Sequence, residues 1–143
     1  MNPFQIKREE WNIEKLGFLK NLVMLIWKGS QGTVTKTEDK LIEQVINEYY
    51  EAHFGKDSIG RLCFNSFYEF STRRIPEICD ENGLRGIDLA SYNYLLKEFY
   101  KGGSHELTLN ENMDSSLFDE TFIVFEIDSI KDDPLLFPLV TLI

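Results

Sequence analysis

The chain has 143 residues, of which 43 % are hydrophobic and 13 % aromatic, and it carries a formal net charge of −9. This composition suits one folded domain with a substantial core and excludes a disordered segment. The negative charge disfavours direct binding to nucleic acid or to an anionic membrane. The longest apolar run, residues 22–27, is too short to span a membrane, and the start does not resemble a signal peptide. We therefore expect a cytoplasmic location.

The first part of the chain predicts a helix near the centre of the fold. We expect residues 2–6 to be extended, because the residue before Pro3 avoids helical geometry. Asn12 is a suitable N-cap for a helix over residues 13–28, and Gly29 can end it. Because the second half of this helix is apolar on nearly all sides, we expect it to lie between other elements.

Two further helices are predicted in the middle of the chain. Thr37 can cap the first of them, and Gly55 can end it in a left-handed conformation. Ser66 and Glu69 have the spacing of a capping box, so we expect the next helix to begin there. Pro76 lies inside this pattern and predicts a kink or the start of a new helical segment.

A fourth helix is predicted over residues 89–99, with Asp88 as its N-cap. Residues 100–103, Tyr-Lys-Gly-Gly, are expected to end this helix, since glycine is the usual residue at a helix stop. Residues 106–109 alternate between polar and apolar types and predict a short edge strand.

The most distinctive stretch is residues 121–127, Thr-Phe-Ile-Val-Phe-Glu-Ile. Its nearly continuous apolar run of β-branched and aromatic residues predicts a strand buried on both faces of a mostly parallel sheet. Asp133 and Pro134 then favour the start of a last helix over residues 135–143. A strand without neighbours and an apolar end suggest a piece of a larger α/β protein.

These elements together predict an α+β fold that is mainly α, with four to five helices and one or two strands. We assign residues 1–120 to a mainly helical subdomain. Residues 121–143 are assigned to a strand and a truncated helix that belong to a larger core.

Glu126 and Asp128 are the candidate metal ligands. A hydrophobic strand that ends in acidic residues resembles a Walker B element, whose carboxylate holds magnesium or activates water. The chain, however, contains no glycine-rich loop of the G-x-x-x-x-G-K-[ST] type to hold phosphates. The alternative interpretation, which we favour, is that these two carboxylates cap or pair locally, so no metal or catalytic residue is assigned.

The other chemically reactive side chains are better explained by structure. His53 and His105 have no partner at metal-ligand spacing. Cys63 and Cys79 lack the spacing of a zinc or redox motif and are expected to be buried free thiols, and Ser66 is more economically a helix cap than a nucleophile. Lys101 and the two glycines after it could contact an anion, but a helix stop is favoured. No cofactor-binding residue is assigned.

Several short stretches resemble the TraG conjugation ATPases of conjugative transposons, which are similar to the cytoplasmic ATPases of type IV secretion. The stretches are Asn2-Pro3-Phe4, Ile13-Glu14-Lys15, Phe18-Leu19-Lys20-Asn21-Leu22, Leu25-Ile26-Trp27-Lys28, Asn47-Glu48-Tyr49-Tyr50, Phe64-Asn65-Ser66-Phe67-Tyr68-Glu69-Phe70, Tyr100-Lys101-Gly102-Gly103, Phe122-Ile123-Val124-Phe125-Glu126-Ile127-Asp128, Lys131-Asp132 and Phe137-Pro138. The resemblance covers essentially all 143 residues.

The resemblance implies that the chain lies within a RecA-like P-loop ATPase domain, between the Walker A loop and the Walker B strand. ATP and Mg²⁺ would then be cofactors of the parent protein, bound outside these residues, and the chain alone would be inactive. The parent is expected to be a hexamer at the cytoplasmic face of the inner membrane. Its partners would be transfer-channel proteins, and those of this chain the other parts of the same ATPase.

Two alternatives remain open from the sequence. The chain could be a self-standing acidic module that docks a partner protein through a helical face. Less favoured is a small metal-dependent hydrolase that uses Glu126 and Asp128.

Overall fold

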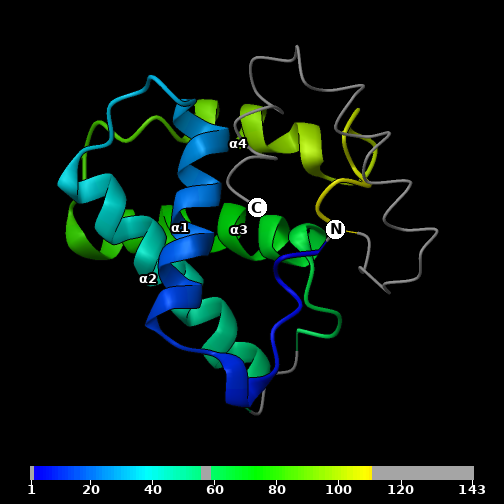
Figure 1. Ribbon diagram of the computed structural model, residues 1–143. Helices are drawn as coiled ribbons and strands as arrows, with labels where there is room; N and C mark the ends of the chain where they lie inside the picture. Colours follow the sequence, from blue (N-terminus) through cyan, green and yellow to red (C-terminus); the bar gives the residue numbers. More distant parts are fainter. Residues whose placement is uncertain (1, 56–58, 111–143) are drawn as a thin grey trace.

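The computed structural model describes residues 2–55 and 59–110 (Figure 1). Every regular element within these two ranges is helical, which confirms the mainly α expectation. The elements are η1 (Arg8–Glu10), α1 (Ile13–Lys28), α2 (Lys36–Phe54), α3 (Phe64–Asn82), α4 (Leu89–Leu96) and η2 (Lys97–Phe99). The strand predicted at residues 121–127 and the helix predicted at residues 135–143 lie outside the described residues.

The first and fourth predicted helices begin where their capping residues place them. The side chain of Asn12 accepts a hydrogen bond from the backbone N–H of Lys15 at 2.9 Å, so α1 begins at Ile13 as predicted. Asp88 caps α4 in the same way, by accepting the N–H of Ser91 at 2.9 Å. The predicted helix over residues 89–99 is divided, because its last turn tightens into the 3₁₀ helix η2.

The predicted start of α2 was wrong, while its predicted end at Gly55 is confirmed. Thr35, not Thr37, is the N-cap, because Glu38 stands three residues after it and completes a capping box. The Glu38 N–H donates to Oγ1 of Thr35 at 3.1 Å, and the Thr35 N–H donates back to the Glu38 carboxylate at 3.0 Å. Gly55 ends the helix with φ −92° and ψ −151°, so it is extended, not left-handed.

The start of α3 was also predicted too late. The helix begins at Phe64, with Cys63 as its N-cap, and Ser66 lies in the first turn. The predicted box with Glu69 does not form because Ser66 is the third residue of the helix and not its N-cap; its hydroxyl donates to the carbonyl of Arg61 at 2.8 Å. The helix runs on through Pro76 to Asn82, so no new segment begins at the proline.

Two predicted extended segments are turns. Residues 2–5 fold back, with the Gln5 N–H donating to the Asn2 carbonyl at 3.3 Å and the Phe4 N–H donating to Oδ1 of Asn2 at 3.1 Å. The predicted strand at residues 106–109 is a series of turns in which the Thr108 N–H donates to the carbonyl of His105 at 3.1 Å. The alternation of residues 106–109 was misleading because no neighbouring strand within the described residues pairs with them.

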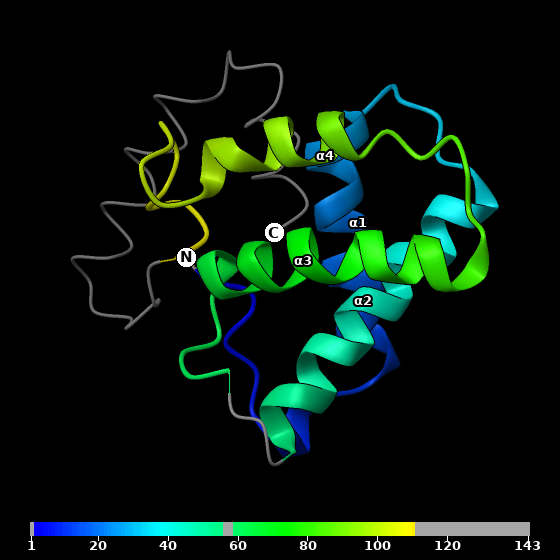
Figure 2. The ribbon, with the colours of Figure 1, turned by 180° about the vertical axis from the view of Figure 1, so that it is seen from behind.

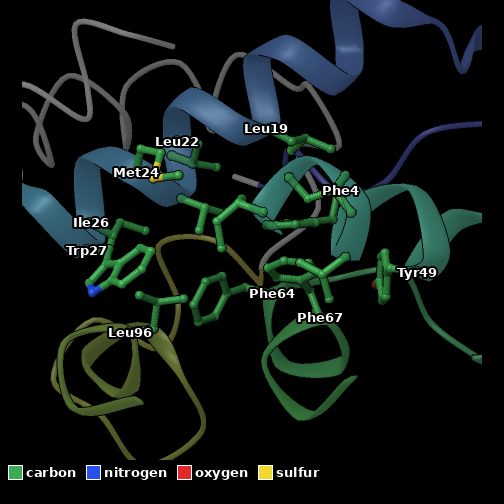
Figure 3. Packing of buried hydrophobic residues seen from close by; sticks show 14 of the residues in the cluster. Phe4, Leu19, Leu22, Met24, Ile26, Trp27, Tyr49, Phe64, Phe67 and Leu96 are labelled. Carbon is green, nitrogen blue, oxygen red and sulfur yellow. The ribbon is translucent and has the colours of Figure 1, made fainter. Parts of the chain in front are cut away.

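Helix α1 lies at the centre of the described part, as its apolar composition predicts. It packs against α2 and α4, and α2 also packs against α3. Seen from behind, α3 crosses the molecule with α4 above it and α2 below it (Figure 2). Figure 3 shows the core where these helices meet. Its largest fully buried side chains include Tyr49, Tyr50, Tyr92, Phe4, Phe64, Phe67, Phe99, Leu19, Leu22 and Ile26.

Candidate functional site

Three stretches singled out in the sequence meet around the first half of α3. They are residues 2–4, residues 64–70 and residues 100–103, and we call their meeting point the α3 junction. Segments from the two ends of the described part are thereby brought together on one helix. The junction is the best candidate for a functional surface, because polar and aromatic side chains from distant parts of the chain are concentrated there.

Phe4 is the apolar anchor of the α3 junction. Its ring is fully buried and stacks on Phe67, with a centroid distance of 5.1 Å and an interplanar angle of 25° (Figure 3). It also meets the rings of Phe64 and Tyr49 edge-on. The Tyr50 hydroxyl donates to the Phe4 carbonyl at 2.8 Å. The N-terminal segment is therefore held between α2 and α3 by both packing and hydrogen bonding.

Two asparagines tie residues 99–110 to the start of α3. Asn65 donates its backbone N–H to Oδ1 of Asn110 at 2.8 Å, and its own Oδ1 accepts the N–H of Lys101 at 3.0 Å. The side-chain amide of Asn110 donates to the carbonyls of Phe99 at 3.0 Å and Glu106 at 2.6 Å. The guanidinium of Arg61 donates to the Asn110 carbonyl. These bonds position the loop in the absence of a strand.

Ser66 belongs to a hydrogen-bonded cluster that has a structural role. Its Oγ lies 2.7 Å from the hydroxyl of Tyr49 and also accepts the N–H of Cys63 at 3.3 Å. Burial raises the pKa of Tyr49, so this phenol stays neutral and can serve as a hydrogen-bond partner without ionising. Ser66 is therefore occupied in holding the first turn of α3, which agrees with its interpretation as a residue of the helix start.

Stacked tyrosines attach the end of η2 to the outer side of α3. The rings of Tyr68 and Tyr100 are 4.4 Å apart with an interplanar angle of 28°. The Tyr100 hydroxyl donates to the carboxylate of Glu69 at 2.5 Å, and this bond, aided by burial, raises the pKa of Tyr100 to about 12. The hydroxyl of Tyr68 donates to the Asn93 carbonyl at 3.2 Å. Both ends of this stack thus connect the α4 region to α3.

The glycines after Tyr100 form the predicted helix stop. Gly102 has φ +88°, which favours glycine, and its N–H donates to the carboxylate of Glu106 at 3.1 Å. At Gly103 a Cβ atom would lie only 2.4 Å from the Lys97 carbonyl oxygen. Because the amides of Lys101 and Gly102 are already bonded within the chain, an anion would have to displace these bonds.

The remaining candidate residues that the structure describes do not gather into a metal site. Glu126 and Asp128 lie outside the described residues. Residues 2–55 and 59–110 contain no group of three or more metal-ligand side chains that could hold an ion. His53 packs against Phe54, while His105 packs against Phe99 at the junction.

The two cysteines are buried free thiols, as the sequence predicts. Burial, helped by the charge of neighbouring Asp80, raises the pKa of the Cys79 thiol. A raised pKa disfavours the reactive thiolate. Because both thiols are buried, neither is placed as a nucleophile at a surface site.

One comparison with known proteins identifies the family of this chain. The family model of the TraG P-loop domain matches residues 1–143. The chain belongs to the TraG P-loop domain family. This membership makes it a region of a conjugation-related P-loop ATPase. No curated protein and no solved structure matches the chain significantly.

Several residues of the α3 junction in this TraG-family chain could not have been found from sequence alone. Asn110 bonds to Asn65 across 45 positions, and such a pair leaves no local pattern. Arg61 and Tyr49 were likewise not expected to meet Asn110 and Ser66. None of the described helices is both long and apolar enough to cross a membrane.

Proposed function

We propose that this TraG-family chain is the mainly helical subdomain of a conjugation ATPase and that it carries no nucleotide site of its own. Its role is structural and interactive: it joins the helices to the P-loop core of the parent protein. The observation that carries this proposal is the convergence of residues 2–4, 64–70 and 100–103 at the α3 junction.

The contacts of these residues support a joining role over a catalytic one. Asn65, Ser66 and Glu69 each use their side chain within the junction. A catalytic residue must instead reach substrate or a reacting atom. The polar groups of these three residues, which belong to the stretches that resemble the TraG family, therefore position segments of the chain.

The position of the junction along the chain also supports this role. Asn110 is bonded to the start of α3, and residues 121–128, which resemble a core strand of the ATPase, follow soon after it. The junction therefore lies where the helical subdomain continues into the proposed core. In the parent protein, ATP and Mg²⁺ would bind outside these residues and hydrolysis would drive transfer of DNA or protein. The parent would act as a hexamer with transfer-channel proteins at the cytoplasmic face of the inner membrane.

Calorimetric titration with a non-hydrolysable ATP analogue and Mg²⁺ tests the absence of a nucleotide site. We expect no saturable binding by the 143-residue chain. A longer TraG-family protein that adds a G-x-x-x-x-G-K-[ST] loop should bind the analogue. Saturable binding by the shorter chain would overturn the proposal.

Substitution at the junction in the longer protein tests the joining role. Asn65→Ala should lower kcat for ATP hydrolysis several-fold and leave nucleotide affinity unchanged, because the phosphate site lies elsewhere. Arg73→Ala is the matched control, since the Arg73 side chain is 64 % exposed on the same helix. Equal activity of the two variants would contradict a role of the junction in the ATPase.

A further inference from the structure

One face of helix α1 is turned away from the core of the described part. In Figure 1 α1 runs in front of α3, and in Figure 2, seen from behind, α3 lies in front of α1. The residues of this face follow each other at helical spacing, so they share one side of the helix. Those that are exposed or only partly buried are Glu14, Gly17, Phe18, Asn21, Leu25 and Lys28, and we call them the outer face of α1. We propose that the outer face of α1 binds the same face of a second copy of this chain, with the two helices antiparallel.

The outer face has apolar surface around a glycine. Phe18 and Leu25 pack against the core on one side and remain partly exposed on the other. Between the ends of α1 lies Gly17, and no atom is within 4 Å of the place where its Cβ would be. Glycine is unfavourable inside a helix, and neither a positive φ nor a nearby atom of the described residues requires it at this position. A second helix packed closely against α1 would require a residue without a side chain here.

The order of the residues along the outer face is complementary to itself when it is reversed. Asn21 stands midway between Glu14 and Lys28, seven positions from each. In an antiparallel pair with its two-fold axis near Asn21, positions that are equally far from Asn21 meet. Glu14 would then face the partner's Lys28, and Phe18 would lie beside the partner's Leu25.

The charges at the two ends of the outer face favour the antiparallel arrangement. A parallel pair would place two Glu14 carboxylates together at one end and two Lys28 ammonium groups at the other, whereas the antiparallel pair places opposite charges together at both ends. Lys28 already meets Glu38 at 2.6 Å, with its side chain 22 % exposed. Because an ammonium has three N–H donors, it can bond to a second carboxylate. At the centre the two Asn21 amides can donate to and accept from each other.

The pairing goes beyond the proposed function and does not rest on it. The outer face of α1 shares no residue with the α3 junction, so both contacts can exist in one protein. A hexamer of D3 symmetry contains two-fold axes. The pair is therefore compatible with the hexameric parent proposed above.

Sedimentation of the 143-residue chain over a range of concentrations measures the pairing. Gly17→Leu should raise the dissociation constant of the dimer at least about tenfold, because the added side chain keeps the two helices apart. The variant should still fold, since the space around Gly17 is open and leucine favours a helix, and circular dichroism verifies this. Ala90→Leu is the matched control, because Ala90 is exposed on α4, and it should leave the dissociation constant unchanged.

Cross-linking through a single cysteine tests the orientation and register of the pair. Asn21→Cys should form a covalent dimer with a short bismaleimide, because the two copies of residue 21 would face each other at the two-fold axis. Asn93→Cys is the control for random encounter, since Asn93 is exposed on α4. The native cysteines, Cys63 and Cys79, are only 5 % and 7 % exposed and should compete little.

Three results would each overturn the proposal. A chain that stays monomeric at every concentration would show that the outer face of α1 is not a contact between copies. A dimer that Gly17→Leu does not weaken would show that another surface of the chain forms the contact. Equal cross-linking of Asn21→Cys and Asn93→Cys would show that the two α1 helices do not meet at residue 21.

Discussion

The side-chain oxygen of Asn110 accepts the backbone N–H of Asn65 at 2.8 Å, and the amide nitrogen of the same side chain donates to two backbone carbonyls. Asn110 is only 6 % exposed. One side chain therefore satisfies three backbone groups at the α3 junction. Its removal leaves those groups without their partner in a place where water has little access.

Asn110→Ala should lower the free energy of unfolding by about 2 kcal/mol, because buried polar groups lose their partners. Urea unfolding followed by circular dichroism measures this change. Asn93→Ala is the control, since Asn93 is exposed on α4. The control should change stability by less than about 0.5 kcal/mol. Equal stability of the native chain and Asn110→Ala would mean that the junction bonds contribute nothing.

Phe4→Ala should destabilise the chain by about 3–5 kcal/mol, because it opens a cavity between α2 and α3. The ring is fully buried against Phe64, Phe67 and Tyr49. Phe4→Leu retains most of the volume and should cost about 1.5 kcal/mol or less. The same urea titration compares the two variants. If Phe4→Ala and Phe4→Leu both lowered the free energy of unfolding by a similar small amount, the N-terminal segment would not be part of the core.

The environment of Glu38 leads us to expect that the chain loses stability at acidic pH. Burial alone would raise its pKa, but hydrogen bonds from Lys28 and Thr35 outweigh burial and hold the pKa below the ordinary value of 4.5. The folded pKa is thus lower than the unfolded one. The stabilisation from this group is fully present above about pH 4.5 and is lost as the pH falls through the folded pKa.

Unfolding free energy measured from pH 7 to pH 3 checks this prediction. Glu38→Gln keeps an acceptor for the capping box but removes the charge that meets Lys28 at 2.6 Å. We expect the variant to be less stable at pH 7 and to lose less stability on acidification. If the free energy of unfolding fell equally with pH in the native chain and in Glu38→Gln, the lowered pKa of Glu38 would be contradicted.

The environment of Tyr100 leads us to expect a loss of stability at alkaline pH. Its bond to Glu69 raises its pKa to about 12, from an ordinary value of 10. Stability from the neutral phenol is present below about pH 10 and is lost as the pH rises through about 12. Ultraviolet absorbance measured against pH follows the ionisation of tyrosines. Subtracting the curve of Tyr100→Phe from that of the native chain leaves the titration of Tyr100. Glu69→Gln should move the titration of Tyr100 toward 10, and an unchanged titration would show that Glu69 is not its partner.

The sequence by itself determined the family of this protein and the mainly helical content of residues 2–55 and 59–110. The spacing of apolar residues in α1, with Asn12 before it and Gly29 after it, depends only on neighbours within a few positions. Asp88 marks the start of α4 for the same reason. The short motifs that carry the resemblance to the TraG family are also local, and the family model matches residues 1–143.

Only the tertiary structure decided which of several local alternatives was realised. Ser66 and Glu69 have the spacing of a capping box, yet Ser66 bonds to Arg61 and Tyr49, and Glu69 bonds to Tyr100. Residues 106–109 alternate like a strand, but Asn110 anchors them as turns. Tyr49 and Tyr100, which bond to Ser66 and Glu69, lie 17 and 31 positions from them, and Asn110 is itself held by Asn65, 45 positions away. Because such partners meet only after the helices pack, local sequence patterns cannot reveal them.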